Sequence, residues 1–286
     1  MKSKNNNLLG ISFMIISMFA LSINDMTYKY LSFHFPVWES VFFRALSGSI
    51  ISIILVLYFG FDKLKTKKPL GHTVRAFSAA GCVVFYIYGI NNLMLSENIA
   101  IAHSAPIIAA FLAVPILSEK IGILRTSAII IGFIGVLVIV KPGTDLFKFE
   151  SFYPLISACF MASVYLSTRS VMSTDSSVAI IFYYSFALLI TSLIFFPEDF
   201  IIPNFLQLIL AMSLGVMGSI GHLFMSQAAK YADVAVTSPF EYSSFVFVGL
   251  MGFFIFSEVP TLSIYIGGLI IISSGIFIAY RERLNN

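Results

Sequence analysis

Long apolar stretches follow one another along almost the whole of this 286-residue chain, separated by short polar loops. A transmembrane helix needs about 20 consecutive apolar residues, so this chain can hold about ten spans. With 58% hydrophobic and 11% charged residues, the composition is typical of a polytopic helical membrane protein and leaves no room for a separate soluble domain. The predicted spans are residues 8–31, 37–59, 72–92, 97–117, 121–140, 153–172, 177–197, 205–228, 235–257 and 261–280.

The first span is predicted to be retained rather than removed as a signal peptide. The amino terminus MKSKNNN precedes an apolar run, but this run contains no small-residue cleavage site and continues into Asn24 and Asp25. Both cysteines, Cys82 and Cys159, fall inside predicted spans, which argues against a disulfide or a metal site. We therefore expect an integral membrane protein without a metal or cofactor.

The loop charges predict the orientation. Cytoplasmic loops of membrane proteins are enriched in lysine and arginine. With a cytoplasmic amino terminus, 13 of the 17 lysines and arginines lie inside, three lie outside (Lys29, Lys141 and Lys148), and Arg44 lies within the second span. Both termini are therefore predicted to be cytoplasmic.

The second half of the chain reads as a copy of the first. A shift of 140 residues aligns Lys29 with Arg169 and Phe42-Phe43 with Phe182-Tyr183, and a shift of 139 aligns Glu119 with Glu258. This divides the chain into a first repeat, residues 8–141, and a second, residues 153–281. Each repeat has five predicted spans, an odd number, so the two are expected to cross the membrane in opposite orientations.

Two related apolar stretches carry polar residues, a proline and a final Ser-Glu. They run from Glu97 to Glu119 and from Val236 to Glu258. Proline removes a helix hydrogen bond, so Pro106 and Pro239 predict helix breaks. Broken helices in matching positions of two halves are a pointer to the central site of a transporter.

Charged residues inside spans are costly and are candidates for function. Asn24 and Asp25 lie in the first span, and Asp25 is spaced to pair with Lys29 one turn later or to lie with it near the end of the span. Arg44 is deep in the second span, where it either forms an ion pair between spans or contacts an anionic group of a substrate. The residues leave both alternatives open.

The two broken segments contribute further candidates. Glu97 and His103 lie in the fourth span, and Glu241 and Tyr242 in the ninth; a shift of 139 aligns His103 with Tyr242. Phe85, Tyr86 and Tyr88 in the third span could stack on a flat ring or simply pack. His222 in the eighth span is interpreted as a core residue.

No motif of an enzyme is present in the sequence. There is no phosphate-binding loop, no HExxH, no cluster of cysteine and histidine at metal-ligand spacing and no GxSxG. Any energy coupling is therefore expected to use protons or a counter-substrate rather than ATP, with His103 as a titratable candidate. Two alternatives of another class are a non-transporting membrane scaffold and a lipid-modifying membrane enzyme. The buried carboxylates argue against a scaffold, which does not need them, and the missing catalytic motifs argue against an enzyme.

The ten spans in two copies, and the proline thirteen residues before a glutamate (Pro106 to Glu119), resemble the EamA-type carriers of the drug/metabolite transporter superfamily. IND-x3-KYL (Ile23 to Leu31), FFR (Phe42 to Arg44) and TSPFEY (Thr237 to Tyr242) are similar to the S-adenosylmethionine uptake carriers of intracellular bacteria. The resemblance implies an all-α carrier in the cell inner membrane that works by alternating access.

It also implies roles for the candidate residues in a central cavity. Glu97 and Glu241 would suit the cationic groups of S-adenosylmethionine, Phe85 and Tyr88 its base, and Arg44 its carboxylate. The expected partners are this small-molecule substrate, the lipid bilayer and a possible proton or counter-substrate, but no nucleic acid. An amino acid, another cationic metabolite or a riboflavin-like ring compound, moved in either direction, remains an alternative.

Overall fold

The computed structural model describes residues 6–117, 123–145, 147–171, 175–232 and 234–285, and these contain helices and loops but no strand. Glu119, which ends the first of the two matching stretches, lies outside the described residues. The helices are α1 (Asn7–Leu31), α2 (Val37–Phe59), α3 (Pro69–Asn92), α4 (Leu95–Ala102), α5 (Ala105–Leu117), α6 (Ile123–Val140), α7 (Phe152–Val171), α8 (Ser177–Ile194), α9 (Phe205–Tyr231), α10 (Val234–Glu241), α11 (Ser243–Phe256) and α12 (Leu262–Asn285), with short 3₁₀ turns at Phe61–Leu64 and Phe149–Ser151.

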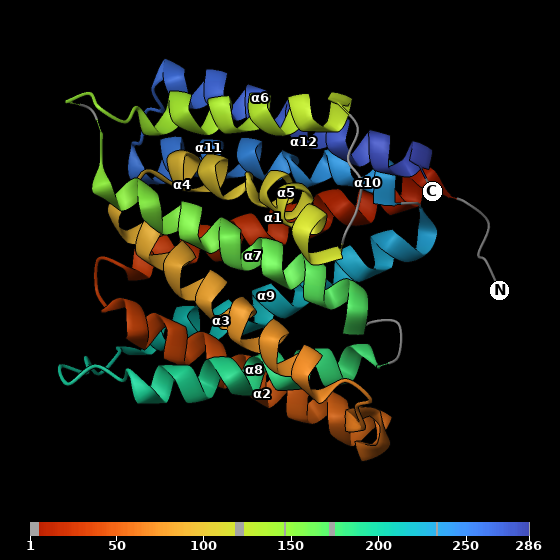
Figure 1. Cartoon of the computed structure of the whole chain (residues 1–286). Helices are drawn as coiled ribbons and strands as arrows, with labels where there is room; N and C mark the ends of the chain where they lie inside the picture. Colours follow the sequence, from red (N-terminus) through yellow and green to blue (C-terminus); the bar gives the residue numbers. More distant parts are fainter. Residues whose placement is uncertain (1–5, 118–122, 146, 172–174, 233, 286) are drawn as a thin grey trace.

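The helices form one bundle with roughly aligned axes (Figure 1). Within the described residues, seven helical segments are long and apolar enough to cross a membrane, and three shorter apolar helices accompany them at Thr126–Val140, Val178–Ile194 and Leu262–Ile278. Large apolar side chains are exposed on the bundle, among them Leu57 at 65% and Phe254 at 76%. A water-soluble surface rarely carries so much apolar area, whereas lipid accommodates it.

Local sequence signals mark where helices start and stop. Asn204 accepts a hydrogen bond from the backbone of Gln207, whose side chain bonds back to the Asn204 backbone, forming a capping box at the start of α9. Ser176 caps α8 in the same way through the backbone of Ala179. At the end of α2, Gly60 has a φ of 94°, a conformation that favours glycine.

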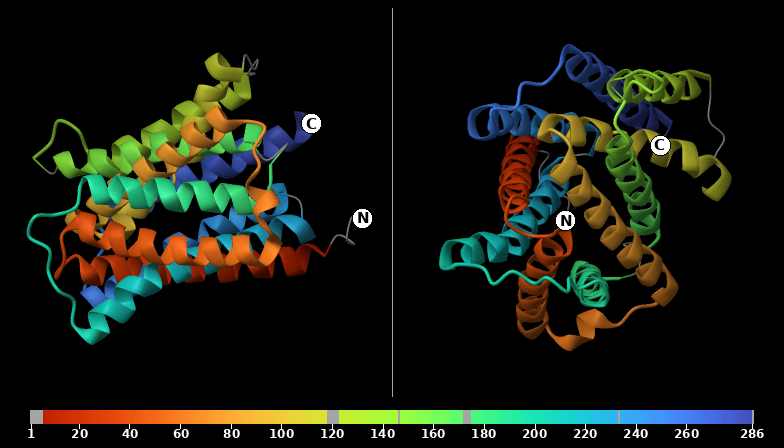
Figure 2. Two further views of the ribbon diagram at one scale, coloured as in Figure 1. Left: turned by 90° about the horizontal axis from the view of Figure 1, so that it is seen from below. Right: turned by 90° about the vertical axis from the view of Figure 1, so that its left-hand side faces the viewer.

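Figure 1 places the start of α1 and the end of α12 at the same end of the bundle. We call this the terminal end and the opposite one the distal end. The two views of Figure 2 show helices from the first and second halves of the chain alternating around the bundle. The closest pairs each join the two halves: α1 with α9, α3 with α7, α2 with α8 and α6 with α12.

Small residues allow α6 and α12 to pack closely. A Cβ added to Gly135 would lie 2.9 Å from the backbone oxygen of Gly267, so the two backbones meet without side chains between them. The side chain of Ser274 donates to the backbone oxygen of Ala128 in the same seam.

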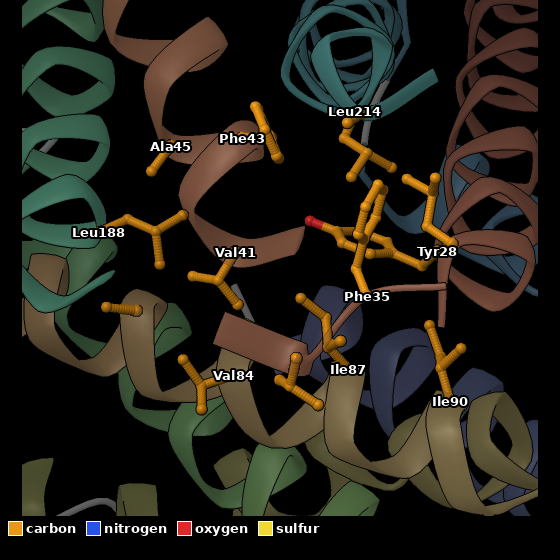
Figure 3. Close-up of a cluster of buried hydrophobic side chains, with 14 of the residues drawn as sticks. Tyr28, Phe35, Val41, Phe43, Ala45, Val84, Ile87, Ile90, Leu188 and Leu214 are labelled. Atoms are coloured by element: carbon orange, nitrogen blue, oxygen red, sulfur yellow. The ribbon is translucent and has the colours of Figure 1, made fainter. Parts of the chain in front are cut away.

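The largest apolar core cluster lies between α1, α2, α3, α8 and α9 (Figure 3). Leu31, Val41, Ile90 and Leu214 are completely buried in it. Tyr28 belongs to this cluster, and Figure 3 shows its hydroxyl directed away from α1 toward the α2 side. The apolar core therefore ends at a polar atom in the bundle interior.

Both matching stretches are interrupted helices. The first is broken at residues 103–104, between α4 and α5, and Pro106 lies in the first turn of α5. The second is broken at Tyr242, between α10 and α11, and Pro239 lies inside α10. The two breaks bring His103 and Tyr242 together, with ring centroids 5.0 Å apart.

Candidate functional site

Arg44 lies in the middle of α2 and projects into the bundle interior. Its guanidinium donates to the hydroxyls of Tyr28 at 3.2 Å and Tyr184 at 3.4 Å, and its Cζ lies 5.7 Å from the Tyr28 ring centroid. No carboxylate of the described residues lies within ion-pair distance of it. Two neutral hydroxyls leave most of its five N–H donors and its full charge available to a ligand.

Asp25 lies in α1 and accepts a hydrogen bond of 2.8 Å from the Tyr86 hydroxyl of α3. It is close enough to Arg44 for their charges to interact, although the two do not form a direct ion pair. Asn24 faces a different neighbour: its amide donates to the backbone oxygen of Leu214 at 2.6 Å and ties α1 to α9. Asn24 thus holds the helix that presents Asp25.

Lys29 does not pair with Asp25, the first of the two alternatives that their spacing allowed. Its ammonium lies at the distal end, 3.2 Å from Glu258, and also donates to the backbone oxygens of Ile90 and Leu93. The physical reason is that the distal end offers the ammonium both a carboxylate, that of Glu258, and carbonyls at the end of α3 that lack helical partners. This leaves Asp25 without a bonded cation among the residues that the structure describes.

The second broken segment places another carboxylate in the interior. The side chain of Glu241, at the end of α10, makes no hydrogen bond or ion pair with the residues that the structure describes, and it interacts electrostatically with Tyr165 of α7 and Tyr242. His103 bonds through Nε2 to the hydroxyl of Ser244 at 3.1 Å. Both helix breaks therefore face the same interior region.

Hydrogen bonds, one ring contact and charge interactions over longer distances connect residues of both halves into one group. We call it the central polar cluster. It consists of Asp25, Tyr28, Arg44, Cys82, Tyr86, His103, Tyr165, Tyr184, His222, Glu241 and Tyr242.

Four predicted site residues lie outside this cluster: Asn24, which bonds to the backbone of Leu214, and Glu97, Phe85 and Tyr88. Glu97, in the first turn of α4, lies 3.5 Å from Lys148 at the distal end. Phe85 stacks on Phe160 with centroids 5.8 Å apart, and Tyr88 lies 5.4 Å from Tyr153. The two aromatic pairs form part of the α3–α7 packing seam, and Glu97 already has a cationic partner.

Several cluster members were not among the predicted site residues, although the repeat contained a signal for them. The shift of 140 residues aligns Asp25 with Tyr165, Arg44 with Tyr184 and Cys82 with His222. Both partners of each pair belong to the central polar cluster. Applying the repeat register to the charged residues Asp25 and Arg44 would therefore have identified Tyr165 and Tyr184, and applying it to Cys82 would have identified His222.

Arg75 was counted with the cytoplasmic loops, but it lies in α3 and donates to the Thr168 hydroxyl of α7 at 2.7 Å. Its charge acts on His222 together with that of Arg44. The region thus has two guanidinium groups and two carboxylates, those of Asp25 and Glu241. Among the described residues, no group of three or more histidine, cysteine or acidic side chains could hold a metal ion.

Comparison with known proteins identifies the kind of protein that carries this cluster. The profile of the EamA-like transporter family matches residues 8–141 and again residues 149–280. The chain belongs to the EamA-like transporter family. This EamA-like chain is 30% identical, over 96% of its length and 93% of the relative, to the S-adenosylmethionine uptake transporter of Rickettsia prowazekii.

A second relative of this EamA-like protein is the pseudopaline exporter CntI of Pseudomonas aeruginosa, strain PAO1. It is 25% identical over 96% of this chain and 97% of the exporter. A solved crystal structure has a TM-score of 0.63 at 16% identity and covers 99% of this chain and 100% of its own, which supports the fold.

The predicted resemblance is thus confirmed, as is the prediction that the protein is not an enzyme, since the family and its named relatives are transporters. It is a multi-pass membrane transporter with a small-molecule substrate.

Proposed function

We propose that this protein is a secondary carrier for a zwitterionic metabolite, with S-adenosylmethionine as the best candidate. One observation carries the proposal: charges of both signs lie mid-span in the central polar cluster without a direct ion-pair partner among the described residues. Unpaired charges inside a membrane are expensive and mark substrate pathways. A ligand that brings the opposite charges would satisfy both sets.

The proposed roles follow the chemistry of the side chains. Arg44, oriented by Tyr28 and Tyr184, binds the substrate carboxylate, since a guanidinium can pair with a carboxylate through two parallel hydrogen bonds. Glu241 and Asp25 bind the cationic groups. Tyr165 and Tyr242 are close enough to Glu241 to interact with its charge, and their ring faces suit a sulfonium or ammonium through cation–π attraction.

Asn24 supports this site by holding α1, and His103 lies at its edge beside Tyr242. We leave Glu97, Phe85 and Tyr88 outside the binding site because their side chains already engage Lys148, Phe160 and Tyr153. His103 stays a candidate for proton coupling, with exchange against a counter-substrate as the alternative.

The proposed architecture is ten spans in two inverted repeats, residues 8–141 and 153–281. Two observations support it: both matching helices are broken, and α1 packs on α9 as its counterpart α7 packs on α3. Since α1 begins and α12 ends at the same end of the bundle, both termini lie on one side. The positive loops assign that side to the cytoplasm, and we place the protein in the inner membrane.

The packing of the broken helices supports alternating access. At the distal end, α4 of the first half packs against α11 of the second. Their counterparts at the terminal end are α5 and α10, and in the described residues α5 packs instead on α6, α7 and α12. In Figure 2 the end of α5 projects from the bundle on the side of the termini. The structure is thus closed distally, as expected for an inward-facing state.

Ligand-induced stabilisation of the purified protein in detergent tests the substrate assignment. S-adenosylmethionine should raise the melting temperature, whereas S-adenosylhomocysteine, which lacks the sulfonium methyl and its charge, should raise it much less. Equal shifts would mean that the sulfonium charge does not contribute to binding. The similarity to an exporter favours a second candidate, export of a different metabolite; that alternative predicts no shift with S-adenosylmethionine.

A further inference from the structure

A compact polar contact closes the distal end of the bundle. Lys29, in the last turn of α1, is 8% exposed, and its ammonium contacts three oxygens: Glu258 Oε1 at 3.2 Å and the backbone oxygens of Ile90 at 2.9 Å and Leu93 at 2.6 Å. The second carboxylate oxygen, Glu258 Oε2, accepts from the backbone N–H of Leu95 at 2.7 Å. We call this set of contacts the distal knot.

Backbone geometry directs Glu258 into the knot. Ser257 has a φ of 56°, in the left-handed region, and the Glu258 N–H donates to the backbone oxygen of Gly252 at 3.0 Å. This turn ends α11 and folds the carboxylate back under it. Glu258 therefore contacts Lys29. Its carboxylate also lies at the start of α4, where the partial positive charge of the helix dipole favours a negative group.

The knot joins the two halves of the chain. The ends of α1 and α3 and the start of α4 come from the first half, and Glu258 comes from the second. It lies where α4 packs against α11, the pair of broken helices that is closed in this structure. Any motion that parts α4 from α11 must break the hydrogen bond from Leu95 to Glu258, and Lys29, which bridges Glu258 and the backbone oxygen of Leu93 just before α4, must give up one of these two partners.

We propose that Lys29 and Glu258 form the outer gate of the carrier, whose opening admits substrate from the distal side. In the closed state each charge is shielded and paired; in the open state both become hydrated at the mouth of the outer pathway. The ammonium also donates to two carbonyls, and the carboxylate accepts from a backbone N–H. Closure therefore needs the cation on α1 and the anion after α11, and opposite charges in the reverse arrangement would not close the gate. The inference rests on the proposed alternating access but not on the identity of the substrate.

The native cysteines provide a test. Cys82 lies in the middle of α3 and belongs to the central polar cluster, whereas Cys159 is exposed on α7. In the Cys159→Ser background, Cys82 is the remaining thiol. Its labelling by a membrane-impermeant thiol reagent, in right-side-out and in inside-out vesicles, measures access from each side without any substrate. The labelling rates therefore test the gate even if the protein does not transport S-adenosylmethionine.

The variant Glu258→Gln keeps an oxygen for the Leu95 N–H but removes the charge. We expect labelling from the distal side to become about tenfold faster or more, with labelling from the terminal side unchanged or slower, since a population shift opens one end. The exchange Lys29→Glu with Glu258→Lys should not restore closure, because the new carboxylate in α1 would face two carbonyls and the new ammonium after α11 would face an N–H. Asp62→Asn, which removes the exposed ion pair with Lys65 in the α2–α3 loop, is the matched control and should change nothing.

Two results would overturn the gate. The first is an unchanged distal labelling rate in a Glu258→Gln protein that remains monodisperse in detergent. The second is an equal increase from both sides, which would mean general loosening of the bundle. A charge-exchange variant that closes as tightly as the parent would reduce the knot to a simple ion pair and would also contradict the orientation that we infer.

Discussion

Arg44 is held by tyrosine hydroxyls rather than by a carboxylate, and this shapes the whole interior of the bundle. A full ion pair would satisfy the guanidinium and leave little reason to bind a ligand. Neutral hydroxyls fix its position through hydrogen bonds of 3.2 and 3.4 Å while leaving its charge uncompensated by direct contact. Glu241 has even fewer contacts. At the scale of single residues, the protein therefore presents charges that are positioned but not neutralised.

Replacing Glu241 with glutamine should weaken binding of a cationic substrate by about 1–3 kcal/mol, because the substrate cation would lose its charged partner inside the protein. Isothermal titration or ligand-induced stabilisation would measure this. Glu198→Gln, in an exposed loop, is the matched control and should bind like the parent. Unchanged affinity in a folded and abundant Glu241→Gln protein would remove Glu241 from the site.

Replacing Arg44 with lysine keeps the charge but loses the planar fork that reaches the two hydroxyls. We expect binding of a substrate carboxylate to weaken by about tenfold or more, or about 1.4 kcal/mol. Tyr184→Phe, which deletes one of the two positioning hydroxyls, should have a smaller effect in the same direction. If Arg44→Lys binds as tightly as the parent, the guanidinium geometry does not contribute.

The sequence predicted Asp25, Arg44 and Glu241 because charges in apolar spans are conspicuous. It did not single out Tyr165 and Tyr184, since this chain has 13 tyrosines and most positions in a span can pack a ring. Only the repeat register, which aligns Arg44 with Tyr184, distinguishes them. Glu97 is conspicuous for the same reason as the other charges, but its position near a helix start does not reveal that Lys148, 51 residues later, lies beside it.

At the scale of helices, close approach of backbones fixes where the site residues point. Gly215 of α9 meets α2 directly, and a Cβ there would lie 2.6 Å from the Gly48 backbone nitrogen and 2.7 Å from the Arg44 backbone oxygen. The backbone of α2, which carries Arg44, therefore packs directly against Gly215 of α9. Helix boundaries follow from apolar length and capping residues, but which helices pair depends on such complementary surfaces, which one sequence does not display.

Gly215→Ala should destabilise the protein by about 1–3 kcal/mol, because neither backbone atom of α2 can move aside cheaply. Thermal unfolding in detergent, followed by intrinsic fluorescence or light scattering, would measure the loss. Gly249→Ala is the matched control: it also lies in a helix, but nothing lies within 4 Å of the added Cβ. This control should be neutral or slightly stabilising, since alanine favours a helix. Equal stability of the two variants would contradict the packing described.

At the scale of the whole molecule, the two halves interleave instead of forming separate domains. Each closest helix pair joins the first half to the second, so neither half can keep its packing without the other. Membrane class and family could be predicted from composition and motifs. The distal closure could not, because Lys29, Leu95 and Glu258 are brought together only by the folded bundle.

Reporter fusions would test the proposed orientation. Fusions at Asn286 and in the loop near Pro69 should report the cytoplasm, and one after Lys148 should report the outside, since positive loops stay inside. A carboxyl terminus that reports the outside would contradict both the inverted repeats and the assignment of the distal end.

The most direct test of the central claim is uptake of labelled S-adenosylmethionine by proteoliposomes that contain the purified protein and unlabelled S-adenosylmethionine inside. The account predicts saturable uptake without ATP, with Arg44→Gln liposomes close to protein-free ones because the carboxylate anchor is lost. Uptake by the folded parent no greater than by the Arg44→Gln protein would contradict the claim that the central polar cluster carries this zwitterion.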